Sequence, residues 1–239
     1  MNDMLKTVWG VLTLKTATFE RLRDDPNGIR KGVLLIAIIS LFVAIPGFID
    51  DLIQGSRPFD AAAIEREFMA GFEPAMQFWP PEVREQFKGS IDVGLRIAAS
   101  IAALPTRLPR PASAVLEALG NFLSRPFGWL GAWLSYLIWV MLFAKLLGGS
   151  GGIREMMATT SLFALPGVLG FFGFVPCLGF ILWLIAFAWG VVIYTKGIAV
   201  ANGFDGLKAV VAVFLPAVLA VLFALGLLFT LIVFLILIA

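Results

Sequence analysis

Long apolar runs separated by short polar connections dominate the chain. Five runs contain no acidic or basic residue, apart from a lysine near the end of the second, and they cover residues 32–49, 127–147, 156–174, 178–195 and 210–237. An α-helix needs about 20 apolar residues to cross about 30 Å of hydrocarbon. The pattern therefore predicts an all-α, polytopic membrane protein with five transmembrane helices.

Residues 1–31, before the first run, are amphipathic. Apolar residues at helical spacing form one stripe: Leu5, Val8, Trp9, Leu12 and Phe19. Lysines and arginines lie near its flank, and the turn Asp24–Gly28 ends the segment. The stripe predicts one N-terminal interfacial helix. It fits equally well a helix packed on the protein's own cytoplasmic ends.

A polar insert, residues 50–126, carries just over half of the chain's charged residues. Its apolar periodicity predicts three helices, beginning near Asp60, Pro81 and Pro111, with a break at Pro126 before the second span. We expect a helical extracytoplasmic insert whose apolar faces turn toward the membrane domain. Its segment 91–104 is apolar but short for a span and includes two charged residues, which argues against crossing.

Lysine and arginine alternate between the two ends of the spans. They occur in the N-terminal arm and in the connections after spans two and four, whereas the connection after span three and the C-terminal tail have none. The positive-inside rule then places the N terminus in the cytoplasm, and the C terminus and insert outside it. The predicted organisation is a cytoplasmic arm (1–31), a first span (32–49), an insert (50–126) and a four-helix transmembrane region (127–239).

Aromatic and hydroxyl residues add local detail to the spans. Trp129 and Trp133 are predicted to mark the outer end of span two, and Tyr194 the inner end of span four, at the level of the headgroups. The run 159–161, Thr-Thr-Ser, fits local backbone hydrogen bonding or interhelical contact, with a ligand pocket as the alternative.

The composition narrows the chemistry. Hydrophobic residues make up 60% and charged residues 14%, against about 45–50% and 25% in soluble domains. The absence of histidine excludes metals and haem held by histidine, and the single cysteine, Cys177, excludes paired-cysteine chemistry. No metal or cofactor is expected, and a net charge of +2 does not suggest nucleic acid. Without ionisable groups inside the spans or a catalytic constellation, we expect neither an ion-driven carrier nor an enzyme.

Small residues and prolines in the later spans are the candidate packing or interaction residues: Gly148, Gly149, Gly151, Gly152, Pro166, Gly170, Ala186, Gly190 and Pro216. The glycine run at 148–152 fits a flexible turn better than an anion site, because no nucleotide-loop Gly-Lys-Ser/Thr follows it. Ala186 and Gly190, four residues apart, allow close helix contact within the chain or between copies. Each proline removes a backbone hydrogen bond and kinks its helix.

Three segments carry a family resemblance. They are Thr18–Pro26, the stretch from Lys145 to Met156 continued by Ala164-Leu-Pro166, and Gly197–Ala209 with Pro216. In order and spacing they resemble the bacterial branch of the Yip domain family, the Rab/Ypt-interacting membrane proteins. The resemblance implies a polytopic, non-enzymatic membrane protein; eukaryotic members bind Rab GTPases in vesicle traffic through cytoplasmic N-terminal regions.

The short arm departs from that family. It lacks the family's Asp-Leu-Tyr-Gly-Pro element, and the superficially similar stretch Asp51–Gly55 lies beyond the first span. Rab binding and functional residues are therefore not transferred to this chain. We expect a Yip-type scaffold or interaction protein of a bacterial inner membrane, alone or as a subunit of a larger assembly, with lipids, other membrane proteins or its own copies as partners. The alternative is a transport or lipid-handling protein with a groove lined by spans three to five.

Overall fold

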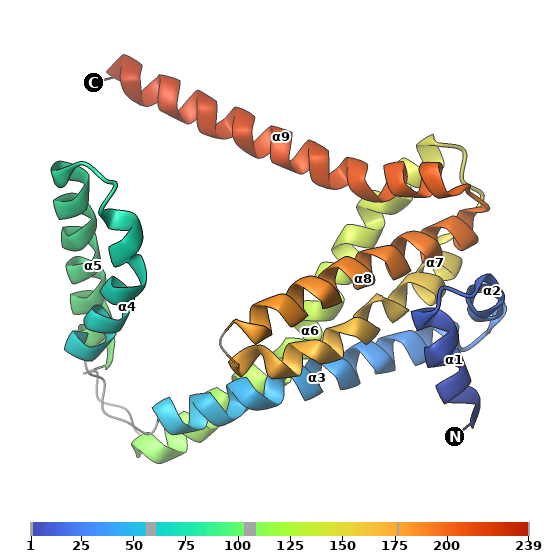
Figure 1. Cartoon of the computed structure of the whole chain (residues 1–239), viewed down its shortest axis with the longest axis horizontal. Coiled ribbons are helices and arrows are strands. Elements are labelled where there is room, and N and C mark those ends of the chain that lie inside the picture. The colour runs from blue at the N-terminus through green and yellow to red at the C-terminus, as the bar shows by residue number, and fades with distance from the viewer. Residues whose placement is uncertain (1, 56–60, 103–108, 176, 239) are drawn as a thin grey trace. The chain divides into compact units, whose positions relative to one another are not determined.

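The computed structural model describes residues 2–55, 61–102, 109–175 and 177–238, and every regular element in these ranges is a helix (Figure 1). In chain order they are α1 (Asn2–Leu12), α2 (Thr16–Asp24), α3 (Gly28–Gly55), α4 (Ala61–Met76), α5 (Pro81–Ala102), α6 (Arg110–Leu146), α7 (Ile153–Thr160), the 3₁₀ helix η1 (Ser161–Phe174), α8 (Leu178–Asn202) and α9 (Gly206–Ile238). Five stretches are long and apolar enough to cross a membrane: α3, α6, α7 with η1, α8 and α9. The predicted all-α class with five transmembrane helices is confirmed.

The chain forms two compact units. The membrane unit comprises Met1–Phe48 and Gly120–Ala239, and the insert unit comprises Ile49–Leu119. In the membrane unit, buried side chains from α3, α6, α7, η1, α8 and α9 form one continuous apolar cluster, which includes Ile36, Leu137, Met156, Ala164, Ile198 and Val213. Burial of these side chains holds the bundle together.

In the insert unit, aromatic rings join α4 to α5. The Phe87 ring lies 5.6 Å from Phe72 and 5.1 Å edge-on from Trp79, measured between ring centroids. Helix α5 begins at Pro81, as predicted, because proline is favoured in the first helical turn. Its two central charges, Asp92 and Arg96, pair with one another at 2.6 Å on an exposed face. Helix α5 is not among the five stretches suited to crossing a membrane.

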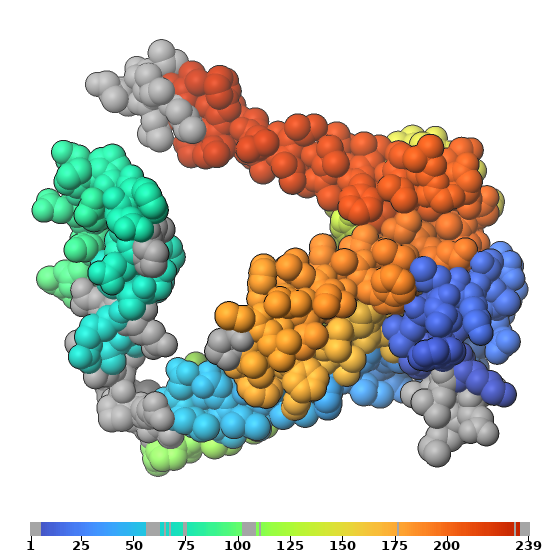
Figure 2. Space-filling model, viewed as in Figure 1, coloured from blue at the N-terminus to red at the C-terminus, as the bar shows by residue number. Residues whose placement is uncertain are grey.

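The N-terminal arm is two helices, so the prediction of one helix is wrong. Leu14, between α1 and α2, has a φ of +56°, which interrupts the helical backbone. Val11 and Phe19 are fully buried with Leu162 and Ile193, so α1 and α2 pack on the membrane unit (Figure 2), while Trp9 stays 65% exposed. The arm therefore has one face against its own chain and one face free.

The predicted helix break at Pro126 is also wrong, because α6 continues through this proline from Arg110 to Leu146. A proline inside a helix removes one hydrogen bond, to the carbonyl four residues earlier, and usually kinks the helix rather than ending it. That earlier residue is Phe122, whose ring packs on Phe48 with 5.1 Å between centroids. Tertiary packing thus supports the helix at the point where the proline weakens it.

The third span was expected to be α-helical, but only its first turns are. Residues Ser161–Phe174 form a 3₁₀ helix. At the change of helix type, Thr160 Oγ1 donates to the Met156 carbonyl at 2.7 Å and Ser161 Oγ donates to the Ala158 carbonyl at 3.2 Å. Side-chain donors of this kind compete with the α-helical backbone pattern. Pro166 then removes a further backbone donor.

Two aromatic residues predicted at the headgroup level are buried inside the bundle. Trp133 is 3% exposed and donates from Nε1 to Thr160 Oγ1 at 3.1 Å. Tyr194 is 6% exposed. The indole N–H of Trp133 finds its partner inside the bundle, so the prediction that this ring lies among the headgroups is wrong. Tyr194 faces the interior of the bundle rather than lipid, and the prediction of its depth in the membrane stays a prediction.

Candidate functional site

Helix α8 lies unusually close to η1 because small residues line its facing side. A Cβ atom at Gly190 would come within 3.0 Å of the Phe163 carbonyl oxygen. In a 3₁₀ helix that carbonyl would accept from the nitrogen three residues later, which is Pro166 and has no hydrogen. Gly190 thus faces a backbone oxygen that Pro166 leaves without its usual donor, and the buried Ala186 lies one turn away on the same face of α8.

Gly197 makes a second close contact, between α8 and α7. A Cβ there would lie 2.7 Å from the Thr159 carbonyl oxygen and 2.9 Å from the carbonyl carbon. Both atoms are backbone, so neither can rotate aside. Absence of a side chain at residue 197 is therefore a condition of this packing.

The glycine-rich connection packs on the end of α8. A Cβ at Gly149 would lie 2.5 Å from Asn202 Oδ1, one at Gly151 would overlap the Ala201 carbonyl, and Gly148 has a φ of +85°. A Cβ at Gly152 would lie 2.6 Å from Glu155 Oε2. The Glu155 carboxylate thus lies at the N-terminal turn of α7, where an anion would bind. This geometry favours a packed turn over an anion site.

The segments that carry the family resemblance meet at the same end of the membrane unit. The connection at 148–152 packs on 201–204, and Leu22 of α2 is buried in a cluster with Val200 of α8. A Cβ at Gly28 would lie 2.9 Å from the Ala158 Cβ, so the start of α3 touches α7. Distant parts of the sequence therefore build one junction.

An ion pair fixes the turn into α3 at this junction. Lys31 Nζ donates to Asp25 Oδ2 at 2.6 Å, and the Asn27 backbone N–H donates to Asp25 Oδ1 at 2.8 Å. The hydrogen bond from Lys31, helped by that from Asn27, holds the pKa of the Asp25 carboxyl below its usual value.

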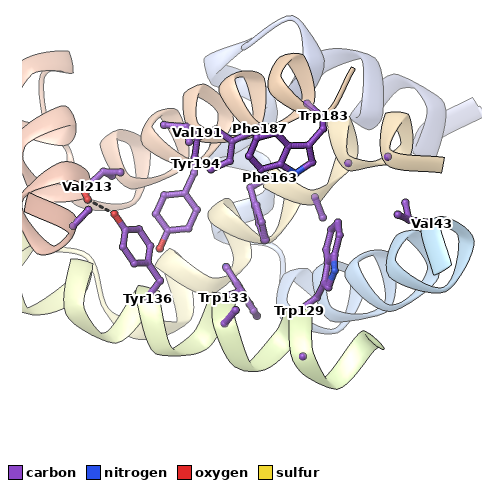
Figure 3. Close-up of a pocket in the computed structure, with 18 of the residues that line it drawn as sticks. Val43, Trp129, Trp133, Tyr136, Phe163, Trp183, Phe187, Val191, Tyr194 and Val213 are labelled. Carbon is purple, nitrogen blue, oxygen red and sulfur yellow. Dashed lines mark hydrogen bonds between the residues drawn. The ribbon is translucent and has the colours of Figure 1, made fainter. Parts of the chain in front are cut away.

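A cavity of about 720 Å³ opens inside the membrane unit (Figure 3). Every transmembrane stretch contributes to its wall: Val43 from α3; Gly128, Trp129, Ala132, Trp133 and Tyr136 from α6; Phe163, Ala164, Gly167 and Gly170 from η1; Trp183, Ala186, Phe187, Gly190, Val191 and Tyr194 from α8; and Val213, Phe214 and Ala217 from α9. None of these lining residues is charged. Its size is that of an ordinary small-molecule site.

The 3₁₀ geometry of η1 forms one wall of this cavity. With three residues per turn, Ala164, Gly167 and Gly170 lie in one row along the helix. Opposite them stand aromatic rings from α6 and α8, as Figure 3 shows for Trp129, Trp133, Trp183 and Phe187. These small residues and rings give the cavity an apolar wall, and the Trp129 ring packs directly on Gly167, where a Cβ would lie 2.9 Å from it.

The two tyrosines of the cavity differ in their hydrogen bonding. Tyr136 Oη donates to the Val213 carbonyl at 2.5 Å. The neighbouring Ala212 carbonyl lacks its usual helical donor, because the residue four positions later is Pro216, which has no N–H. The Tyr194 hydroxyl is buried and has no hydrogen-bond partner among the described residues. Among the described residues of the cavity wall, it is the one fully buried side-chain polar atom that has no hydrogen-bond partner.

The structure divides the nine predicted packing residues into two groups. Gly170, Ala186 and Gly190 line the cavity, with Pro166 and Pro216 buried in its walls. The four connection glycines, at 148, 149, 151 and 152, lie at the junction instead. Sequence reasoning missed the contribution of α6, although Trp129, Trp133 and Tyr136 recur at spacings of four and three and so share one helix face.

Within the described part of the chain, no three acidic or cysteine residues come together as metal ligands would. The fold and the cavity define a polytopic α-helical membrane protein. The Yip1 domain matches residues 9–228, nearly the whole chain, and the protein belongs to the Yip1 domain family, which is not a known enzyme family. No curated protein and no solved structure matches the chain.

Proposed function

We propose that the protein is a non-enzymatic scaffold of Yip type that binds other membrane proteins as part of a larger assembly. The observation that carries this proposal is the surface of α9. Every residue from Val218 to Leu231 is exposed, and Figure 2 shows this part of α9 uncovered by the rest of its chain on the visible face. Ala220 and Ala224, one turn apart, give part of that surface the small residues that close helix contact requires.

Extraction in mild detergent tests the scaffold. The wild-type protein should extract as a complex heavier than one chain in detergent. Ala224→Phe should reduce that mass, because a bulky ring keeps the partner helix away. Leu222→Phe is the matched control, since residue 222 lies about 200° around the helix from residue 224. A wild-type extract that contains only single chains refutes the scaffold.

We further propose a bacterial inner membrane, with the N terminus in the cytoplasm and the insert and C terminus outside. The alternation of lysine and arginine supports this orientation. The junction adds support, because the arm, the connection near Lys145 and Arg154, and the connection after Lys196 meet at one end of the membrane unit. Three segments that contain lysine and arginine thus lie near one another, which is what a common cytoplasmic side requires.

A second candidate function is lipid handling within the membrane. The cavity favours it, since its wall is apolar, uncharged and built from all five transmembrane stretches. A protein that holds lipid in this cavity should retain it through purification, and filling the cavity should abolish that retention.

A further inference from the structure

The unpaired hydroxyl of Tyr194 points to a ligand. A buried polar group without a hydrogen bond costs about 1–3 kcal/mol, and most such groups have a partner. Ring contacts hold Tyr194 in place: its ring lies 5.9 Å from Tyr136 and 6.1 Å, edge-on, from Phe163. Figure 3 shows the hydroxyl directed toward the cavity wall formed by α6, between Tyr136 and Trp133. The donor is thus kept in a fixed place.

The depth of this hydroxyl in the bilayer indicates which ligand atom it would meet. Lys196, the charged residue at this end of α8, lies two residues further on, about 3 Å along the helix axis. Tyr194 therefore lies near the boundary between hydrocarbon and headgroups. In a glycerolipid, the groups at that boundary are the ester carbonyls, which only accept hydrogen bonds.

The extent of the cavity indicates the shape of the ligand. Its wall on α8 runs from Tyr194 to Trp183, eleven residues or about 16 Å. This is close to half of the hydrocarbon thickness of about 30 Å, and so to the depth of one leaflet. The uncharged wall would accept a hydrocarbon chain and exclude a charged headgroup.

We infer that the cavity binds one acyl chain of an ester-linked membrane lipid, and that the Tyr194 hydroxyl donates a hydrogen bond to the ester carbonyl of that chain. The chain lies along the small residues of η1, and the headgroup stays in the interface beside Lys196. This inference rests on the second proposed function and deepens it by naming the ligand class and the residue that selects it.

Comparing the retention of an ester lipid with that of an ether lipid distinguishes the contribution of this hydrogen bond from apolar fit alone. The full-length protein is reconstituted in nanodiscs that contain equal amounts of a diester phosphatidylcholine and its diether analogue, and bound lipid is measured by native mass spectrometry. The wild type should retain the diester about fivefold more than the diether, the factor that one hydrogen bond of about 1 kcal/mol supplies. Tyr194→Phe should retain both lipids equally.

Three further variants locate the bound lipid and serve as controls. Ala132→Trp places a large ring at an exposed position of the cavity wall and should abolish retention. Leu134→Trp adds the same ring to α6 outside the cavity and should not. Trp139→Phe removes a ring N–H from an exposed aromatic side chain and should leave the fivefold preference intact. Thermal unfolding in detergent checks that each variant is folded.

The outcomes separate the inference from the proposed function. If Ala132→Trp loses the lipid but Tyr194→Phe still prefers the ester lipid, the proposed role of Tyr194 is overturned. Lipid handling in the cavity then still stands. No retained lipid in the wild type, or equal retention in Ala132→Trp, overturns both. A bound mass equal to a free fatty acid, in protein extracted from its native membrane, overturns the assignment to a glycerolipid.

Discussion

Replacing Gly197 by alanine tests the close contact between α7 and α8. The added Cβ would lie 2.7 Å from the Thr159 carbonyl oxygen, 2.9 Å from its carbon and 3.2 Å from the Thr160 nitrogen. These three atoms belong to the backbone, so the helices must separate or shift to admit the methyl group. Overpacking of this kind typically costs about 1–3 kcal/mol.

Gly226→Ala is the matched control in α9. Nothing lies within 4 Å of a Cβ at this residue. Both substitutions gain the same intrinsic helix propensity, about 1 kcal/mol, so the difference between the two variants isolates the contact at Gly197. We expect Gly197→Ala to unfold at a free energy about 1–3 kcal/mol below that of Gly226→Ala.

The assay is reversible unfolding by SDS titration in mixed micelles, with the mass of the folded particle measured in parallel. Lower stability at an unchanged mass indicates a contact within one chain, as the structure has it. Equal free energies of unfolding for the two variants would refute the reasoning, because the α7–α8 contact would then tolerate a side chain at this point.

Three further outcomes are expected. Topology reporters inserted at Gln77 and fused to the C terminus should both report an extracytoplasmic location. A cytoplasmic C terminus would refute the predicted orientation of the five spans. Because the bond from Lys31 lowers the pKa of Asp25, this pair stabilises the fold above the unfolded pKa of about 3.9 and loses its effect as the pH falls through the lower, folded pKa. Asp25→Asn should therefore be less stable than the wild type near pH 7, and the difference should vanish in acid; a constant difference across this range in unfolding titrations would contradict the assignment. A double-mutant cycle of Trp133→Phe with Thr160→Val should give a coupling of about 0.6 kcal/mol, typical of hydrogen bonds between membrane helices, and zero coupling would mean that the bond contributes nothing.

The number and order of the spans could be predicted because each is an uninterrupted apolar run of the required length. This signal depends on the solvent rather than on neighbouring helices. Helix type within a span could not be predicted in the same way. In η1 apolar residues occur on all sides, so periodicity carries no information, and Pro166 signalled only that the helix could deform.

The errors at Pro126 and Trp133 have a common physical origin. Each residue type has a typical local role, as a helix breaker or an interfacial ring, and tertiary contacts replaced that role. The packing of Phe122 on Phe48 supports the helix before Pro126, and Thr160 provides the partner that the indole of Trp133 would otherwise find among headgroups. Phe48 and Thr160 lie on other helices and are remote in sequence. A prediction from local sequence pattern therefore does not include them.

The candidate cavity was partly predictable. Small residues on spans three and four pointed to close helix contacts, and Gly170, Ala186 and Gly190 do line the cavity. The unpaired state of Tyr194 could not be foreseen, because it depends on which carbonyls happen to lie near its hydroxyl. Tyr136 has such a carbonyl at Val213, whereas Tyr194 has none among the described residues.

The 3₁₀ form of η1 couples the length of the third span to the shape of the cavity. Its 14 residues rise about 2.0 Å each and extend about 28 Å, whereas an α-helix of the same residues would extend about 21 Å. Rewinding from 120° to 100° per residue would also turn Gly170 by about 140° relative to Phe163. A thinner bilayer favours the shorter helix, and that helix would carry Gly170 out of the row that it shares with Gly167. Membrane thickness thus acts on the same backbone that forms the cavity wall.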